Sequence, residues 1–176
     1  TGVVGTDIAR FQIKNAKLRG VRGDLVVCCA EYMPFKSNVF DCIVCSEVIE
    51  HVVSPKTTLL EIERMLRNDG YLCISTDNPL SIYRKIVELI KRTMRWNKNV
   101  KEEFIPLAVL TELVPSTIKL YKILHICPYP LLPMVGFLGS KILGKTWLSL
   151  ASIIKKLPYI NKQFCNKYII FGVKHA

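Results

Sequence analysis

The sequence predicts an α/β fold, a doubly wound and mostly parallel sheet with helices on both faces. Two features of the first half of the chain lead to this prediction. Short, continuously apolar segments of strand length occur there, and they alternate with segments whose apolar residues have helical spacing. Apolar strands are typical of parallel sheets buried on both faces, and the helices between them supply the crossovers that parallel strands need.

Four segments of the first half are expected to form strands, because each is apolar and bounded by turn-forming or polar residues. They are residues 3–7, 25–29, 40–45 and 71–75. A helix is expected directly after the first strand, since Ile8, Phe11 and Leu18 have helical spacing.

The third and fourth strands are joined by the most clearly marked helix of the sequence. Ser54 is a favourable N-cap residue, and Pro55 is favoured at the first helical position. Apolar residues then recur at helical spacing as far as Leu66, and the turn-forming residues 68–70 are expected to end the helix.

The second half of the chain is expected to add two helical segments and two strands. The helices are an amphipathic one with a basic face over residues 81–95 and an apolar one around residues 142–157. The strands are residues 118–126 and 168–173. A chain of 176 residues suits one domain, with residues 1–80 as its core and residues 81–176 as a lid helix, last strands and an insertion.

The seven cysteines favour a reducing compartment. Their number is odd and most lie inside apolar segments, so they are expected to be buried thiols in a cytoplasmic protein rather than a disulfide framework. Cys42 and Cys45 have the spacing of a redox or metal motif. On a strand, however, residues three apart point to opposite faces and do not converge on one ion.

The net charge of +11 is concentrated in the second half of the chain. Residues 1–80 have nine Lys and Arg against ten Asp and Glu, a net −1, whereas residues 81–176 have sixteen against four, a net +12. The first half therefore has the charge of a neutral scaffold. The basic half is compatible with an anionic partner, a membrane surface or plain exposure to water.

Four short motifs follow one another in residues 1–80. They are Val3-Val4-Gly5-Thr6-Asp7, Ala30-Glu31-Tyr32-Met33-Pro34-Phe35, Phe40-Asp41-Cys42-Ile43-Val44-Cys45-Ser46-Glu47-Val48-Ile49-Glu50-His51 and Leu66-Arg67-Asn68-Asp69-Gly70-Tyr71-Leu72. In this order and spacing they resemble the type-11 family of class I S-adenosylmethionine-dependent methyltransferases, from the second strand of the family's sheet onward. The resemblance implies a Rossmann-like sheet, S-adenosylmethionine as the cofactor and methyl transfer to an acceptor.

The resemblance also implies which residues bind the cofactor, at the carboxyl ends of the strands where ligands bind in open α/β sheets. Asp7 is expected to accept hydrogen bonds from the ribose hydroxyls, or to cap the helix that follows, or both. The segment after the second strand is expected to hold the adenine, or to form a plain turn. The other residues assigned to cofactor binding are Ile8, Ala30, Glu31, Tyr32, Cys45 and Ser46.

Two departures from the family pattern affect these expectations. Cys29 stands where the family commonly has an aspartate for the adenine amino group, so the adenine would depend more on the backbone and on Glu31. The family's glycine-rich loop has no counterpart before Asp7. We therefore expect the chain to be a fragment that begins at the family's second strand, with about 40 residues missing upstream.

This truncation has two expected consequences. Without the family's central first strand, the chain is expected to aggregate or to stay partly unfolded. The strands at residues 3–7 and 40–45 are expected either to be separated by an empty slot or to collapse together in a pairing foreign to the family.

Methyl transfer needs few catalytic residues, because the sulfonium of the cofactor already activates the methyl group. His51 is the best candidate for a base by its position and because an imidazole can exchange a proton near neutral pH, and a purely structural role is its alternative. If residues 47–51 form a helical turn, Glu47, Glu50 and His51 share a face that suits a divalent ion. We expect no metal, with these carboxylates solvated or capping.

The acceptor is expected to be a small molecule, lipophilic or quinone-like, with O-methylation favoured over N- or C-methylation. An RNA methyltransferase is the alternative within the same fold, but the basic residues alternate with apolar ones and no aromatic stacking platform is evident, so a nucleic-acid partner is disfavoured. A non-catalytic chain that no longer binds cofactor is the second alternative. Residues 131–157 are apolar but broken by proline and glycine, which is compatible with capping an acceptor site or with peripheral membrane contact.

Overall fold

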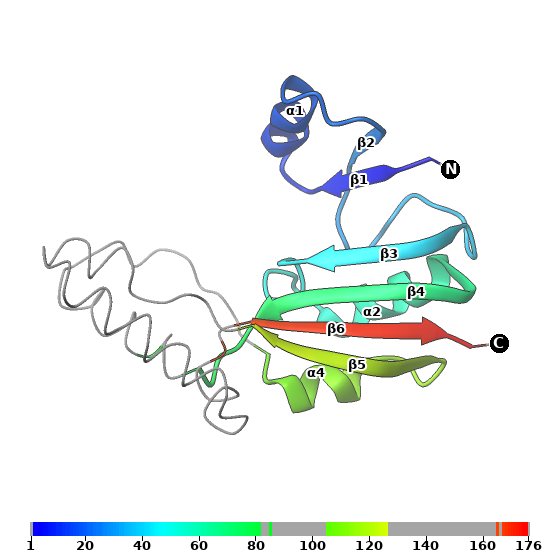
Figure 1. The fold of residues 1–176 in the computed structure, drawn as a ribbon. Helices are drawn as coiled ribbons and strands as arrows, with labels where there is room; N and C mark the ends of the chain where they lie inside the picture. Colours follow the sequence, from blue (N-terminus) through cyan, green and yellow to red (C-terminus); the bar gives the residue numbers. More distant parts are fainter. Residues whose placement is uncertain (1, 82–84, 86–104, 127–164, 166, 176) are drawn as a thin grey trace, which may run out of the picture.

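The computed structural model of the chain describes residues 2–81, 85, 105–126, 165 and 167–175. Within these residues the chain forms two separate sheets with helices packed against them (Figure 1). The smaller sheet pairs β1 (Val4–Asp7) with β2 (Asp24–Val27) in parallel. The larger sheet has the order β3-β4-β6-β5. Its strands are β3 (Phe40–Ser46), β4 (Leu66–Asp77), β6 (Lys167–Lys174) and β5 (Ile118–Ile126).

The small sheet is covered by a single described helix, α1 (Arg10–Leu18). Only Ile13 of this helix is buried, while Phe11 and Leu18 are exposed. Gly20 lies just beyond the end of α1 with a φ of 74°, and Gly23 directly precedes β2 with a φ of 127°; both values lie in a region that favours glycine. The unit of β1, α1 and β2 thus has little apolar core of its own.

The large sheet is mixed, with both parallel and antiparallel strand pairs. β3 and β4 are parallel, whereas β6 lies between β4 and β5 and is antiparallel to both. Figure 1 shows that β1 and β3 run in the same direction, so the carboxyl ends of β1, β2, β3 and β4 lie at one edge of the molecule.

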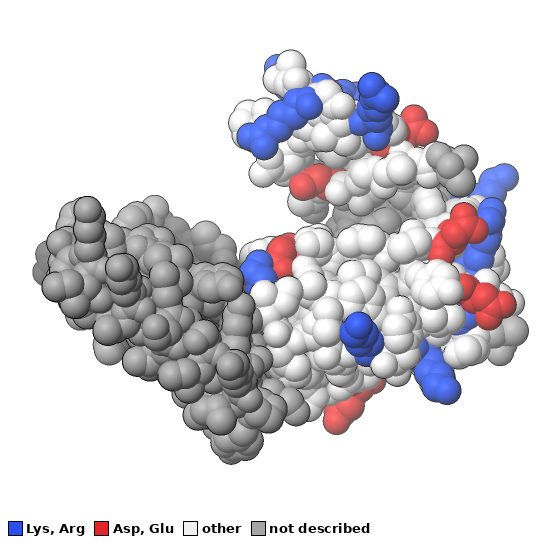
Figure 2. Space-filling model, viewed as in Figure 1, with Lys and Arg blue, Asp and Glu red and all other residues white. Residues whose placement is uncertain are grey.

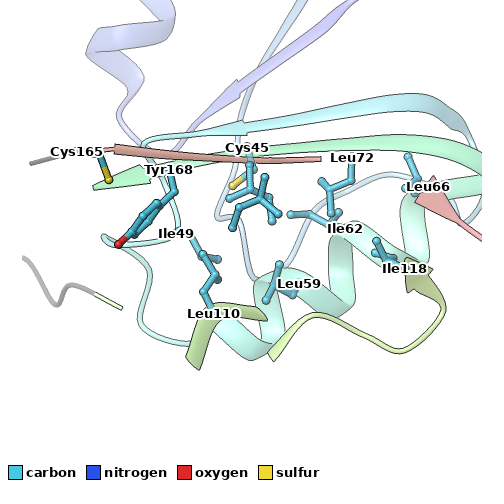
Figure 3. Close-up of a cluster of buried hydrophobic side chains, with 12 residues drawn as sticks. Cys45, Ile49, Leu59, Ile62, Leu66, Leu72, Leu110, Ile118, Cys165 and Tyr168 are labelled. Carbon is cyan, nitrogen blue, oxygen red and sulfur yellow. The ribbon is translucent and has the colours of Figure 1, made fainter. Parts of the chain in front are cut away.

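The apolar core lies between the large sheet and α2 (Pro55–Met65), with α4 (Leu107–Leu113) beside it. Ser54 caps α2 as its residue type suggests, since its Oγ accepts a hydrogen bond from the Thr57 N–H at 3.3 Å. Side chains from all these elements meet in the core (Figure 3). Its fully buried members include Ile49, Leu59, Ile62, Leu66, Leu72, Ile74, Leu110 and Ile170.

The expected α/β fold is confirmed, with corrections at particular elements. The second helix ends at Met65 rather than Leu66, and β4 begins at once, so the residues expected as a helix stop lie within the strand. Two of the four described strand pairs are antiparallel, because β6 runs against both neighbours. Helix α4 was not expected. The expected helix at residues 142–157 and most of that at residues 81–95 lie outside the described residues.

Two ionic side chains of α2 hold the segment that joins the two sheets. The Arg64 guanidinium donates to the carbonyl oxygens of Phe35 at 2.8 Å and Met33 at 3.2 Å. The Glu61 carboxylate accepts from the Met33 N–H at 3.1 Å and pairs with Arg64 at 2.8 Å. These bonds fix the path of the chain from β2 to β3 along the end of the large sheet.

Candidate cofactor and acceptor site

A cavity of about 600 Å³ lies between the two sheets. Its walls come from β1, from the segment after β2, and from β3 with the loop that follows it. Figure 2 shows it as a hollow between the part built on β1, α1 and β2 and the part built on the large sheet. β1 and β3 form no hydrogen-bonded pair, so of the two expected arrangements, a slot or a collapsed pairing, the structure has the slot.

Asp7 ends β1 at the cavity. One oxygen of its carboxylate, Oδ1, accepts a hydrogen bond from the Ala9 N–H at 2.7 Å, just ahead of the first turn of α1. The capping alternative for Asp7 is therefore wrong, because Ala9 is the N-cap residue of α1 and no side chain caps the helix. The Asp7 carboxylate makes a local turn before the helix and lines the cavity where the ribose was expected. Ile8 lines the cavity beside it.

The segment after β2 forms a tight turn, with the Tyr32 N–H donating to the Cys29 carbonyl oxygen at 3.2 Å. Ala30 and Glu31 line the cavity. Tyr32 is 79% exposed and is not among the lining residues. Of the three residues expected to hold adenine, two lie at the cavity.

The Glu31 carboxylate is buried and is used for a structural connection. Its Oε1 accepts from the Val53 N–H at 2.8 Å, and its Oε2 accepts from the Cys29 thiol at 2.5 Å. The hydrogen bond from Cys29, together with those from the Val53 and Ser54 amides, lowers the pKa of Glu31 although burial acts to raise it. An ionised Glu31 thus ties the end of β2 to the loop after β3, across the floor of the cavity.

Cys45 and Ser46 end β3 and line the cavity. Burial raises the pKa of the Cys45 thiol to about 12, so the thiol stays protonated. Cys42 is exposed, whereas Cys45 is buried. The Ser46 hydroxyl is 2.9 Å from the Ser75 hydroxyl on β4.

The loop of residues 47–53 forms one wall of the cavity, and it departs from the expected helical turn. Glu47 has a φ of 54°, a left-handed conformation that turns the chain sharply away from β3. Ile49 is buried in the core, and Glu50 accepts a hydrogen bond from the buried Thr76 hydroxyl at 3.1 Å. Burial raises the pKa of Glu50. His51 is exposed and lines the cavity.

The residues of the three-residue metal hypothesis are placed by separate contacts. The Glu47 and Glu50 carboxylates accept hydrogen bonds from the Ser75 and Thr76 hydroxyls of β4. The His51 N–H donates to the Val48 carbonyl oxygen at 2.9 Å, which closes a turn that begins after Glu47. In the described part of the chain, no three His, Cys, Asp or Glu side chains are grouped closely enough to bind a metal ion.

Lys167 contributes to this edge of the site and was missed in the sequence. Its Nζ donates to the Glu47 carboxylate and lies 3.9 Å from Oδ1 of Asp77. Lys167 is 120 residues from Glu47 in the chain and is one of many lysines in the basic half. Lys167 lies near Glu47 because β6 pairs with β4. The local sequence around Lys167 does not predict that pairing.

The comparisons with known proteins agree with this geometry. Residues 1–74 match a family model described as a methyltransferase domain. A ubiquinone biosynthesis O-methyltransferase of Bartonella quintana is 35% identical over 80 residues, which are 43% of this chain and 32% of that protein. The chain spans less than half the length of the curated relatives it matches.

Solved structures are similar over nearly the whole chain. An S-adenosylmethionine-dependent methyltransferase from Mesorhizobium loti has a TM-score of 0.66 at 12% identity, covering 98% of this chain and 80% of its own. The [4+2]-cyclase SpnF has a TM-score of 0.63 at 14% identity, covering 99% of this chain and 67% of its own. At such identities the likeness shows the fold alone.

The fold is that of the class I methyltransferases, a Rossmann-like α/β architecture. The family-model match over residues 1–74 confirms the resemblance to the type-11 methyltransferases found in the sequence, and the matches indicate S-adenosylmethionine as the cofactor of that family. No helix in the described part of the chain is both long enough and apolar enough to cross a membrane.

Proposed function

We propose that this chain takes part in S-adenosylmethionine-dependent methyl transfer to a small acceptor. The observation that carries the proposal is the cavity, where the ends of β1, β2 and β3 bring Asp7, Ala30 and Ser46 together from three separate segments. The match of residues 1–74 to a methyltransferase domain supports it independently.

The donor set of the cavity fits this cofactor. The Asp7 carboxylate suits a pair of ribose hydroxyls, and it lies at the carboxyl end of β1, where ligands bind in open α/β sheets. Ile8, Met33 and Phe35 give the cavity an apolar lining near Ala30, which suits an adenine ring. Because Glu31 is engaged by Val53 and Cys29, we assign it to positioning the loop rather than to direct adenine recognition.

We assign His51 the role of base. It is the one imidazole that lines the cavity among the described residues, and an imidazole has its ordinary pKa near neutrality. When bound, the cofactor supplies an activated methyl group, so the protein has only to position the acceptor, exclude water and accept a proton. A hydroxyl acceptor needs that proton to be removed, which is why a base at this position favours O-methylation.

A lipophilic or quinone-like acceptor is the finer form of the proposal. The 35%-identical relative from Bartonella quintana acts in ubiquinone biosynthesis by its name, and this supports a phenolic or quinone-like acceptor here. The cavity walls are mainly apolar, with Val44, Val48, Val52 and Val53 on the side of β3 and its loop.

Calorimetric titration with S-adenosylhomocysteine tests the cofactor site. In a chain extended to the length of its relatives, Asp7→Ala is expected to weaken binding by about 1.5–3 kcal/mol, the usual loss of hydrogen bonds to a charged group. Asp24→Ala is the matched control, because Asp24 begins β2 at the opposite end of the small sheet and is exposed. Asp7→Asn shows how much of the loss is due to charge, since an asparagine oxygen still accepts from Ala9.

Two results would contradict the proposal. Equal affinity in Asp7→Ala and Asp24→Ala would remove Asp7 from the cofactor site. Wild-type protein that is folded by circular dichroism but binds no S-adenosylhomocysteine would support the non-catalytic alternative. Transfer of tritiated methyl from S-adenosylmethionine to a catechol, with none to total RNA, is the expected outcome for the acceptor class.

A further inference from the structure

Glu47 has an unfavourable backbone conformation at the mouth of the cavity. Its φ of 54° is rare for a residue with a side chain and costs conformational energy that other contacts must offset. Glu47 directly follows β3 and starts the loop that carries His51. Whatever holds Glu47 therefore also sets the direction in which this loop leaves the sheet.

Three contacts hold Glu47, and all come from the neighbouring strands. Its N–H donates to the Ser75 carbonyl oxygen at 3.0 Å, and its Oε1 accepts from the Ser75 hydroxyl at 2.8 Å. Its Oε2 accepts from Nζ of Lys167. Ser75 is a central-strand residue next to Glu47, whereas Lys167 reaches across the whole width of β4 from β6.

Lys167 is itself fixed in place. It is the first residue of β6 and lies opposite Asp77 in the antiparallel ladder with β4. Partial burial acts to lower the pKa of Lys167, but the hydrogen bond and charge of Glu47, with the charges of Asp77 and Glu50, raise it overall. The ammonium group is therefore charged throughout the neutral range.

The partial exposure of this ion pair limits its contribution to the stability of the fold. The Lys167 and Glu47 side chains are 38% and 35% exposed, and such pairs add little to global stability. A charge-assisted hydrogen bond nevertheless fixes geometry, because the carboxylate has one preferred place between its two donors.

We propose that Lys167 is a positioning residue of the site, which holds the Glu47 carboxylate and thereby fixes the turn that places His51 in the cavity. The proposal deepens the proposed function, because it rests on His51 being the base. After Glu47 the loop is held by Ile49 in the core and Glu50 on Thr76, and His51 follows directly. Lys167 thus connects the start of β6 to the loop that carries His51, and it does so through Glu47 and not through a ligand.

Proton NMR of the full 176-residue chain tests this coupling, with the His51 imidazole resonance identified by its loss in His51→Asn. Spectra are taken at about pH 8.5, where an imidazole of ordinary pKa is neutral, so that altered titration does not mimic a structural change. Lys167→Met is expected to shift and broaden the His51 resonance, and Lys167→Arg is expected to restore it.

Lys174→Met is the matched control on the same strand. Lys174 lies at the other end of β6 and donates to the Glu63 and Leu66 carbonyl oxygens at 2.8 Å, at the end of α2. Its loss is expected to lower the melting temperature and to leave the His51 resonance in place. A shift of equal size in Lys174→Met would reveal a general loosening of the fold and overturn the proposal.

The charge-balanced double variant Glu47→Gln/Lys167→Met separates position from charge. It removes the ion pair without changing the net charge, and it is expected to shift the His51 resonance as Lys167→Met does. A wild-type spectrum in the double variant would show that only charge matters and would refute a positioning role. Because no measurement in this series needs cofactor or turnover, failure of the proposed function would be seen separately, in the S-adenosylhomocysteine titration.

Discussion

Two buried glutamates show how the surroundings of a side chain decide the effect of one substitution. Glu31 and Glu50 are 6% and 5% exposed, but their pKa values move in opposite directions. Hydrogen bonds from the Cys29 thiol and the Val53 and Ser54 amides stabilise the ionised form of Glu31. At Glu50, burial outweighs the hydrogen bonds from its own backbone N–H and from the Thr76 hydroxyl. The same change to glutamine should therefore have different results at the two positions.

Glu31→Gln is expected to destabilise the fold at pH 7 by about 1.5–3 kcal/mol, because the thiol and the amides lose a charged acceptor. The folded pKa of Glu31 is lowered, so its stabilisation is present above the ordinary value of 4.5 and is lost as the pH falls through the folded value. Urea unfolding should thus show the variant approaching wild type in acid. A difference that persists undiminished below the folded pKa would contradict this account.

Glu50→Gln is expected to leave the free energy of unfolding at pH 7 equal to or above that of wild type. The folded pKa of Glu50 is raised, so wild-type stability declines as the pH rises from about 4.5 through the folded value. A glutamine oxygen still accepts from Thr76 and has no charge to bury. Marked destabilisation of Glu50→Gln in urea at neutral pH would show that the ionised carboxylate is needed.

The sequence predicted the individual site residues unevenly, and the difference has a physical cause. Asp7, Ser46 and His51 follow strands whose apolar pattern is easy to read, so their place at the strand ends could be expected. The partners that position them, such as Val53 for Glu31 and Lys167 for Glu47, depend on tertiary pairing. Tyr32 belonged to the matching motif, but the tight turn at Cys29 leaves it exposed.

Among the elements, β6 packs closely against β5 at Gly172. A Cβ at Gly172 would lie 2.8 Å from Cγ2 of Ile118 and 3.1 Å from Cδ2 of Leu120, both on β5. Gly172→Ala is expected to destabilise the large sheet by about 1–3 kcal/mol, the usual cost of overpacking. Gly2→Ala is the control, because a Cβ there would meet no heavy atom within 4 Å. Chemical denaturation of both variants checks this, and equal stabilities would contradict it.

Element boundaries show where a local pattern is overridden. The residues before Tyr71 are typical of a helix stop and turn, yet they lie in β4, where the pairing shifts register between Phe40 and Cys42. Asp69 has a φ of 61°, a left-handed conformation typical of turns. Here that conformation occurs within an irregular strand and not in a turn between two elements. Helix α4 has seven residues, too few for its periodicity to be distinguished from a strand or loop.

At the scale of the whole molecule, the two sheets are expected to open as separate units. The small sheet has two strands and one helix with a single buried apolar residue, whereas the large sheet carries the buried core. In native-state hydrogen exchange, the amides of β1 and β2 should exchange at a lower free energy than those of β4 and β6, because isolated two-stranded sheets are marginal. A single common free energy for all four strands would contradict the division.

The small sheet also limits what any ligand of the cavity can gain. The walls of the cavity belong to the two sheets, which are joined by the chain from β2 to β3 and by Glu31. No backbone hydrogen bonds between β1 and β3 fix the width of the cavity. A molecule that touches both walls must restrict their relative motion, and this loss of entropy subtracts from the enthalpy of its contacts. Binding should therefore have a favourable enthalpy and an unfavourable entropy. A second ligand that binds after the first should lose less entropy, because the relative motion of the two walls is already restricted.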